Sequence, residues 1–361
     1  LHYNADIGKL GICFDSLYAR EYVGCDGNPE YQPLSDGLAW LDEHFTAQEN
    51  PGKRQSHLYY YLYGVERVGL AGGLKYFGGK DWYKEGVREL LNRRRDGGWG
   101  NLENTAFALL FLARGQHPIA FNKLWYNGTW NNRPRDMSNV TRWISREFES
   151  PVQWQIIRPE HPVREWHDAP ILYISGATTP RFKDRELRRL RRFVLQGGML
   201  LSESACSRAS FTLAMRKVYA KLFPGRPLKR LPDDHPVYGE VHYRLRERPE
   251  LWGVSNGIRL LAVHSPEDLS LNWQTNSVRA RTEAFQLAAN LYFLATDKGS
   301  LRRRGTRHWP EASRVAPVAT LRVAPVRHEG NHRPEPLAWE AFALRMGQEH
   351  RVKVELAEPT D

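Results

Sequence analysis

Apolar residues in the first third of the chain recur at the spacing of amphipathic helices. We predict four helices, at residues 34–45, 58–68, 82–93 and 105–112, joined by turns that contain glycine or proline. In the third, Val87, Leu90 and Leu91 follow the i, i+3, i+4 pattern. One stripe of each helix must therefore pack against neighbouring helices.

Beyond about residue 121 the pattern changes to strands that alternate with helices. We predict strands at 123–126 and 152–157 around a helix at 136–149, followed by an apolar strand at 170–176. A helix from Asp184 to the glycines at 197–198 then leads to a strand that begins at Met199. Apolar runs without alternation are typical of strands buried on both faces of a parallel sheet. The pattern predicts a doubly wound α/β domain at residues 121–297, in which the strands near Ile171 and Met199 are parallel neighbours.

Part of this pattern occurs again 200 residues later (333 − 133 = 200). The identical pairs are Asn131/Asn331, Arg133/Arg333, Pro134/Pro334, Glu149/Glu349, Val152/Val352 and Pro159/Pro359. We interpret residues 298–318 as a basic linker and 319–361 as the truncated start of a second α/β copy. The chain opens on Leu1 and stops after the repeated strand, so we expect it to be a piece of a longer polypeptide. A β-α-β piece cannot bury both of its faces, so we expect it to pack poorly or against another part of the protein.

Composition supports a globular protein, since 361 residues with 41% hydrophobic content can form about two or three cores. Cys13, Cys25 and Cys206 lie too far apart for a zinc knuckle and do not resemble a dense disulfide scaffold. The formal net charge of +11 favours an anionic ligand or partner, but no nucleic-acid-binding motif accompanies it. No cofactor, metal site or membrane span is predicted.

The glycine-rich turn before the fourth helix is similar to a turn found in a known family of helical proteins. Asp96-Gly97-Gly98-Trp99-Gly100, followed by the helix at 104–110, resembles the Gly-x-Trp turn of the prenyltransferase and squalene-cyclase type α/α toroid. This implies a partial toroid at residues 1–120. The cyclase Asp-x-Asp-Asp motif and the prenyltransferase zinc ligands are missing. His57 and Tyr61 either line a groove for a carbohydrate or isoprenoid, or pack between helices.

The loop after Leu201 is the candidate site of the α/β domain, because ligands bind beyond the carboxyl ends of parallel strands. Cys206 is a candidate nucleophile with His235 as base and Glu203 or Asp234 as carboxylate. The alternative is that Cys206 is a small buried hydrophobe and that His235 and Asp234 fix a turn. Glu203 is the best single candidate, because a carboxylate beside a buried sheet needs donors, a cation or a raised pKa.

Residues 121–297 also resemble an uncharacterised bacterial domain-of-unknown-function family with a class I glutamine amidotransferase-like, flavodoxin-like fold. The residues that carry this resemblance include 130–134, 172–176, 187–198, 201–206 and 234–238. It implies ligand binding by Trp130, Asn131, Arg133, Ser175 and Gly176, and an acidic residue and a cysteine near Glu203 and Cys206.

True amidotransferases carry a Gly-x-Cys-x-Gly elbow. Here Ser204 lies nearest the nucleophile position, and Ser202 and Cys206 replace the glycines. We therefore favour a ligand- or partner-binding accessory module of a larger protein of the bacterial cell envelope or periplasm. The alternatives are a cysteine- or serine-dependent hydrolase or amidotransferase-like enzyme using Cys206 or Ser204, and carbohydrate or isoprenoid binding by the toroid.

Overall fold

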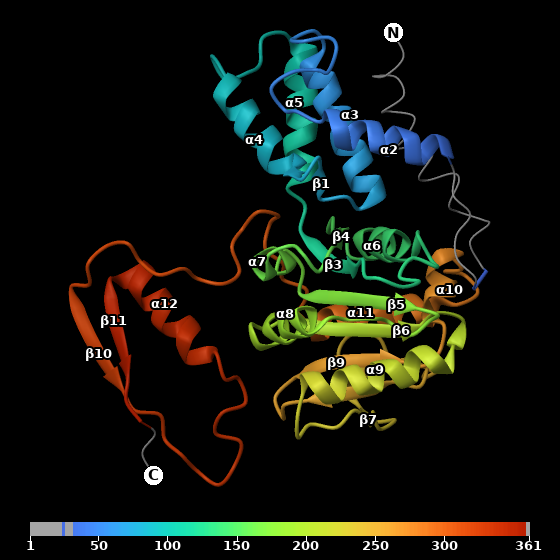
Figure 1. Ribbon diagram of the computed structural model, residues 1–361, viewed down its shortest axis with the longest axis vertical. Coiled ribbons are helices and arrows are strands. Elements are labelled where there is room, and N and C mark those ends of the chain that lie inside the picture. The colour runs from blue at the N-terminus through green and yellow to red at the C-terminus, as the bar shows by residue number, and fades with distance from the viewer. Residues whose placement is uncertain (1–23, 26–31, 359–361) are drawn as a thin grey trace.

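The computed structural model describes residues 24–25 and 32–358. Three parts follow one another along the chain: a helical segment, an α/β domain and a smaller C-terminal unit (Figure 1). Within the described residues, none of the helices has the length and apolar character needed to cross a membrane.

The helical segment contains α2 (Gln32–His44), α3 (Leu58–Gly72), α4 (Trp82–Arg93) and α5 (Leu102–Gly115), which confirms the four predicted helices. A short antiparallel pair, β1 (Tyr76–Phe77) and β2 (Lys80–Asp81), lies between α3 and α4. The indole N–H of Trp99 donates to the carbonyl of Leu90 at 2.7 Å and so closes the glycine-rich turn over α4. Helices α4 and α5 meet at Gly86, where an added Cβ would lie 2.2 Å from the ring of Phe111.

The α/β domain is built on a seven-stranded sheet with the order β4-β3-β5-β6-β9-β8-β7. Its parallel strands are β3 (Ile119–Leu124), β4 (Gln153–Ile157), β5 (Ile171–Gly176), β6 (Met199–Ser204) and β9 (Leu260–Ser265). Ile171 pairs with Met199 in parallel register, which confirms the predicted neighbours. Two antiparallel strands that we did not predict, β8 (Trp252–Ser255) and β7 (Lys229–Arg230), complete one edge. The sheet is therefore mostly parallel.

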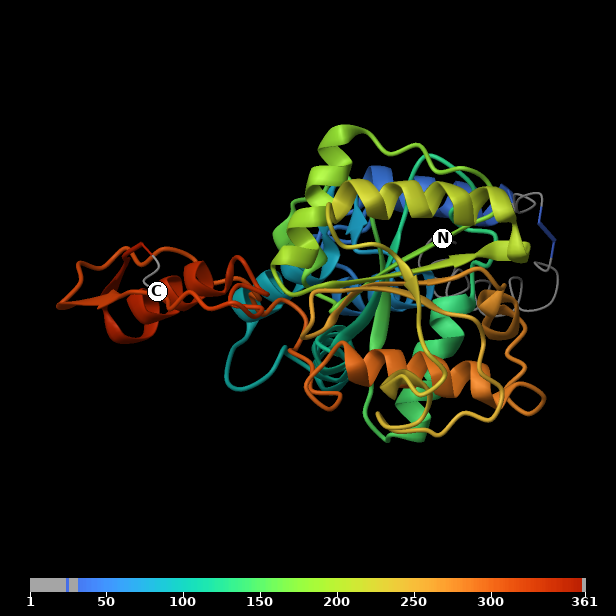
Figure 2. The same ribbon diagram turned by 90° about the horizontal axis from the view of Figure 1, so that it is seen from below.

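Helices cover both faces of this sheet (Figures 1 and 2). One face packs against α6 (Asp136–Glu147), α10 (Leu269–Gln274) and α11 (Thr282–Leu294). The other packs against α8 (Asp184–Leu195) and α9 (Ala209–Leu222). Shorter helices are α7 (Val163–Trp166), η1 (Ala205–Ser207) and η2 (Pro236–Tyr238). Side chains alternate between the faces, so Leu201 and Glu203 lie on the α6 side and Leu200 and Ser202 on the α9 side.

The helical segment attaches to the sheet at its β4 edge. The amide of Ile156 donates to the carbonyl of Gly73 at 2.6 Å. Lys75 forms a buried ion pair with Asp168, with 2.5 Å between Nζ and Oδ2. This segment covers part of a strand edge that would otherwise expose unpaired backbone groups.

The C-terminal unit contains β10 (Ala319–Val323), α12 (Ala338–His350) and β11 (Val352–Leu356), and its two strands pair in parallel. It follows the order of β3, α6 and β4, and β10 begins 200 residues after β3 (319 − 119 = 200). None of the residues of α12 is buried. The unit contacts the α/β domain through Glu335, whose carboxylate lies 2.6 Å from Nε of Arg259.

Candidate functional site

Glu203 lies at the carboxyl end of β6 and is fully buried. Its Oε1 atom accepts hydrogen bonds from the hydroxyls of Tyr173, at 3.0 Å, and Ser175. Its Oε2 atom is buried without a hydrogen-bond partner among the described residues. Burial, with a further contribution from the charge of Asp268, raises the pKa of Glu203 to about 7. This carboxyl group can therefore gain or lose a proton near neutral pH.

A buried ion pair lies on the same face of the sheet. Nζ of Lys123, on β3, lies 2.7 Å from Oδ1 of Asp136 at the start of α6, and it also donates to the carbonyl of Arg133 at 2.6 Å. The Lys123 amine also lies over the ring of Tyr173, which bonds Glu203. Burial lowers the pKa of Lys123, whereas the charge of Asp136 opposes that change.

A second ion pair joins the loop after β3 to α10. Arg133 is almost fully buried, and its Nη2 atom lies 2.7 Å from Oδ2 of Asp268. Asp268 also caps α10 by accepting from the amide of Leu271 at 3.0 Å. With Glu203 ionised, the centre holds three carboxylates, with Asp136 and Asp268, against the two cations of Lys123 and Arg133. A proton on Glu203 balances these charges.

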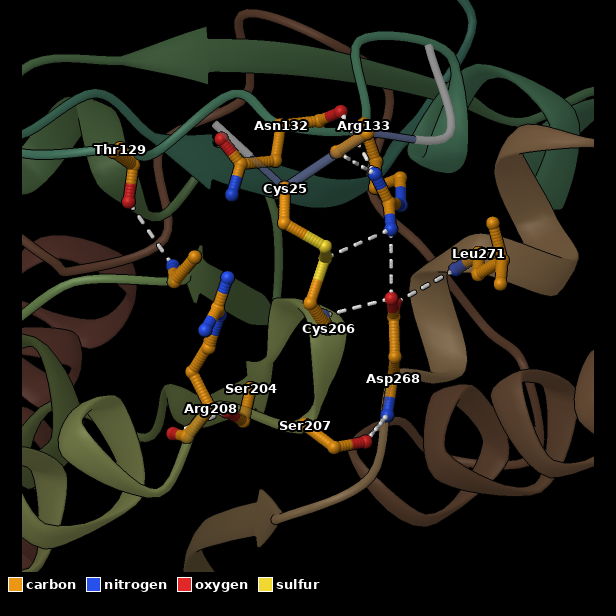
Figure 3. Close-up of a disulfide and its surroundings, with 12 residues drawn as sticks. Cys25, Thr129, Asn132, Arg133, Ser204, Cys206, Ser207, Arg208, Asp268 and Leu271 are labelled. Atoms are coloured by element: carbon orange, nitrogen blue, oxygen red, sulfur yellow. Dashed lines mark hydrogen bonds and ion pairs between the residues drawn. A yellow bond between two sulfur atoms is a disulfide. The ribbon is translucent and has the colours of Figure 1, made fainter. Parts of the chain in front are cut away.

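Cys206 forms a disulfide with Cys25, with 5.9 Å between the Cα atoms (Figure 3). Its amide donates to Oδ2 of Asp268 at 2.8 Å, and Nη2 of Arg133 lies 3.3 Å from its sulfur. Arg133 also donates to the carbonyl of Gly24 at 2.6 Å. A disulfide sulfur carries no thiolate, so the expected nucleophilic thiol is absent in this state.

The loop after β6 adopts a conformation that few side chains adopt. Cys206 has φ 57° and Ser207 has φ 50°, so two successive residues other than glycine are left-handed. The disulfide and the Asp268 contacts hold this turn. Ser204, the other candidate nucleophile, is buried and donates to the carbonyl of Arg208 at 2.8 Å.

The predicted base lies elsewhere. His235 lines a cavity of about 610 Å³ with residues of β7 and β8, at the far edge of the sheet from β3. Its Nδ1 atom accepts from the amide of Val237 at 3.2 Å, and Asp234 is exposed beside it. The structure does not bring His235 and Asp234 to Glu203 and Cys206, because β9 and β8 separate β7 from β6. The His235 side chain bonds the turn at residues 235–237, as the alternative interpretation expected.

The predicted ligand-binding residues gather where the strand order reverses, between β3 and β5. Gly176 is packed tightly, since an added Cβ would lie 2.1 Å from the hydroxyl oxygen of Tyr126. The hydroxyl of Thr129 accepts from the amides of Ala177 and Thr178 at 3.0 and 3.1 Å. The side chain of Thr129 thus satisfies these two backbone amides.

The other predicted ligand-binding residues have different surroundings. Trp130 stacks on Trp125 with 5.0 Å between ring centroids, and Asn131 is half-buried. Ser175 bonds Glu203, and Arg133 is held in its ion pair. Ser175 and Arg133 therefore belong to the Glu203 centre.

The aromatic groove predicted for the helical segment is not formed by the two residues named for it. Tyr61 is 1% exposed and belongs to the core of the segment. His57 is exposed at the start of α3 with φ 54°. Tyr61 packs between helices, so the alternative interpretation of this tyrosine is correct.

Sequence reasoning missed Lys123, Asp136 and Tyr173 as members of the centre, whereas it expected the loop that contains Asp268 to add polar groups near the cleft. A usable signal was present for Lys123, because a lysine inside an apolar strand requires a buried partner. Asp268 follows a strand and precedes a helix, which is typical of a helix cap and carries no further signal. Among the described residues, no group of three or more His, Cys, Asp or Glu side chains is placed to hold a metal ion.

Comparison with protein families gives one result. Residues 120–296 match the model of the family described as "Domain of unknown function (DUF4159)". The α/β domain is therefore similar to this family over residues 120–296. This confirms the expected uncharacterised domain family and places the Glu203 centre inside the matched region. None of the curated proteins matches the chain.

Proposed function

We propose that the α/β domain is a non-enzymatic binding module of a larger protein, and that its recognition surface is the set of loops at the carboxyl edge of the sheet. Open α/β sheets bind their ligands beyond the carboxyl ends of the strands. In this domain those loops are fixed by buried charges and by the disulfide.

One contact carries the proposal. The same oxygen of Asp268 accepts from the amide of Cys206 at 2.8 Å and from Arg133 at 2.7 Å. This links the loop after β6, the loop after β3 and the start of α10 at one point. A preorganised surface loses less conformational entropy on binding, so such bracing favours recognition.

The charge of the loops after β3, β5 and β6 favours an anionic partner. Residues 125–135, 177–183 and 205–208 contain two, two and one Arg or Lys, and no Asp or Glu. The loop after β9 contains Glu267 and Asp268, and Asp268 is paired with the buried Arg133. Arg181 and Lys183, which follow β5, are exposed. Complementary charge would steer a negatively charged ligand or protein surface to this edge.

The geometry offers little support for a hydrolase. Nucleophilic catalysis needs an adjacent base or a lowered pKa. Cys206 is oxidised, and the described bond of the Ser204 hydroxyl is to a backbone carbonyl. A serine–histidine pair does exist, with 2.8 Å between Oγ of Ser202 and Nδ1 of His264, but both side chains are completely buried.

The disulfide also favours one type of cellular compartment for this protein. Such bonds persist in oxidising compartments and are rare in the cytosol. This supports the cell envelope or periplasm as the location.

Two measurements test the proposal. We expect the oxidised chain to hydrolyse glutamine and p-nitrophenyl acetate no faster than its Ser204→Ala variant. We also expect immobilised polyglutamate to bind the wild type more tightly than R181Q/K183Q. R188Q/R192Q, which changes two exposed arginines on α8, is the control for net charge. Hydrolysis that disappears in Ser204→Ala would argue against a non-enzymatic role. Equal loss of polyglutamate binding in both double variants would argue against the proposed recognition surface.

Thiol chemistry after reduction is the second candidate function. It is favoured by the 3.3 Å contact between Arg133 and the Cys206 sulfur, because a nearby guanidinium stabilises a thiolate. Alkylation of the reduced chain, measured against pH, separates the two functions. The binding proposal expects Cys206 to alkylate with the pH response of an ordinary thiol. Rapid alkylation of Cys206 below pH 7 that is lost in Arg133→Met would instead support thiol chemistry by the reduced protein.

A further inference from the structure

A second cavity lies between the helical segment and α6, away from the Glu203 centre. It has a volume of about 390 Å³, which is within the range of small-molecule sites. Its lining residues belong mainly to α3, α6 and β4. In Figure 1, α6 lies beside β4, and α3 lies above them. Its basic residues are Arg67, Arg114, His117, Arg135, Arg142 and Arg146.

The periodicity of α6 places its cavity-lining side chains on one face of the helix. On α6, Ser138, Arg142 and Ser145 follow the three- and four-residue spacing of one face and line the cavity. Met137, Val140 and Ile144 lie on the opposite stripe and are buried in the sheet-facing core. Packing of the apolar stripe therefore turns the polar stripe of α6 toward α3.

Four arginines of this cavity form no ion pair among the residues that the structure describes. Within the described part of the chain, Arg67, Arg114, Arg142 and Arg146 have no carboxylate within 4.0 Å. Arg135 donates to the carbonyl of Ala71 at 3.1 Å, which links α6 to α3 across the cavity.

One acidic side chain lies beside these arginines in the helical segment. Glu66 lies next to Arg67 on α3 but is completely buried, and its carboxylate oxygens have no described hydrogen-bond partner. Burial raises the pKa of Glu66 to about 7, although Arg67 and Arg114 oppose the change. His117 adds no charge of its own, because burial and Arg114 lower its pKa.

We propose that this cavity is a binding site for a small phosphate-bearing anion, such as a pyrophosphate or a phosphate ester. Guanidinium groups match phosphate oxygens with paired hydrogen bonds, and several of them together favour more than one negative charge. A bound anion would relieve the repulsion between these arginines. The site is independent of the recognition surface proposed above, because the two share none of the arginines tested.

Isothermal titration of the full chain with inorganic pyrophosphate tests the site. The test variant is R142Q/R146Q, because both side chains are exposed on α6 and their loss should not unfold the domain. The control is R188Q/R192Q, which makes the same charge change on an exposed face of α8. We expect the control to match the wild type and the test variant to bind at least roughly tenfold more weakly, the effect of one lost charged contact.

Two further titrations, with citrate and with an oligonucleotide, define the class of ligand. Citrate of similar charge should bind more weakly than pyrophosphate, and a single-stranded oligonucleotide should not compete with it. Equal pyrophosphate affinity in all three proteins, or equal loss in both variants, would overturn the proposal in favour of non-specific attraction. Tighter binding of citrate would overturn the phosphate assignment, and strong competition by the oligonucleotide would indicate a nucleic-acid surface. A test variant with an unchanged melting temperature but no loss of affinity would also refute the site.

Discussion

Nζ of Lys123 lies 2.7 Å from Oδ1 of Asp136 in the interior of the α/β domain, where their side chains are 1% and 0% exposed. Such a pair offsets the cost of removing two charges from water only when both partners are present. Removal of one partner leaves the other charge buried and unpaired.

We therefore predict that Lys123→Met lowers the free energy of unfolding by about 3 to 5 kcal/mol. The double variant K123M/D136L should be more stable than the single variant, because it leaves no unpaired charge. Urea unfolding monitored by tryptophan fluorescence gives both values. A double variant less stable than K123M would show that the unpaired charge of Asp136 does not cause the lower stability of K123M.

The raised pKa of Glu203 makes the free energy of unfolding of the domain depend on pH, and the direction of this dependence can be stated. The folded carboxyl keeps its proton up to about pH 7, whereas the unfolded group loses it near the ordinary value of 4.5. Between these values the folded state binds more protons, so the free energy of unfolding falls as pH rises, by at most about 3 kcal/mol.

Glu203→Gln should remove this part of the pH dependence. The measurement is urea unfolding of the wild type and variant at pH 5 and pH 7.5. Glu66→Gln is the comparison, because the pKa of Glu66 is also raised to about 7 but in the helical segment. An unchanged difference between the two pH values in Glu203→Gln would contradict the prediction.

The disulfide should stabilise the described structure by limiting the unfolded chain. Cys25 and Cys206 are 181 residues apart, and a loop of this size corresponds to about 2 to 5 kcal/mol. We expect a reductant to lower the melting temperature of the wild type and to leave that of Cys206→Ser unchanged. An equal shift in both proteins would mean that the reductant acts elsewhere.

Gly176 should not tolerate a side chain. A Cβ there would lie 2.1 Å from the hydroxyl oxygen of Tyr126 and 2.7 Å from the ring of Phe211, so Gly176→Ala should cost about 1 to 3 kcal/mol. Gly239→Ala is the control, because its nearest neighbour would be 3.7 Å away. Tyr126→Phe in the Gly176→Ala background should recover part of the loss in urea unfolding. No recovery would indicate that the ring of Phe211 alone sets the cost.

The parallel neighbours β5 and β6 could be predicted because their sequences carry the information locally. Each is an apolar run that precedes or follows a helix with a strong apolar stripe, and short connections leave few topologies. The limits of β3 were less certain: we predicted 123–126, and the strand covers Ile119–Leu124. Asn122 and Lys123 interrupt its apolar run, and both are buried because distant residues bond them.

The antiparallel strands β7 and β8 were missed for a related reason. They contain two and four residues, and Lys229 and Arg230 are exposed on the last strand of the sheet. Two polar residues are too few to show the alternation of apolar and polar positions that is typical of a strand. Pairing with β8 defines β7 as a strand.

The amino-acid sequence by itself determined the helical segment, the mostly parallel sheet and the position of Glu203 at a strand end, because helix and strand periods and apolar runs are local properties. Only the tertiary structure decided that Cys206 pairs with Cys25, that Lys123 meets Asp136 and that His235 lies at the far edge of the sheet. These relationships depend on how separate helices, strands and loops are placed in the fold. Their chemistry depends on distance in space, which the spacing along the chain does not specify.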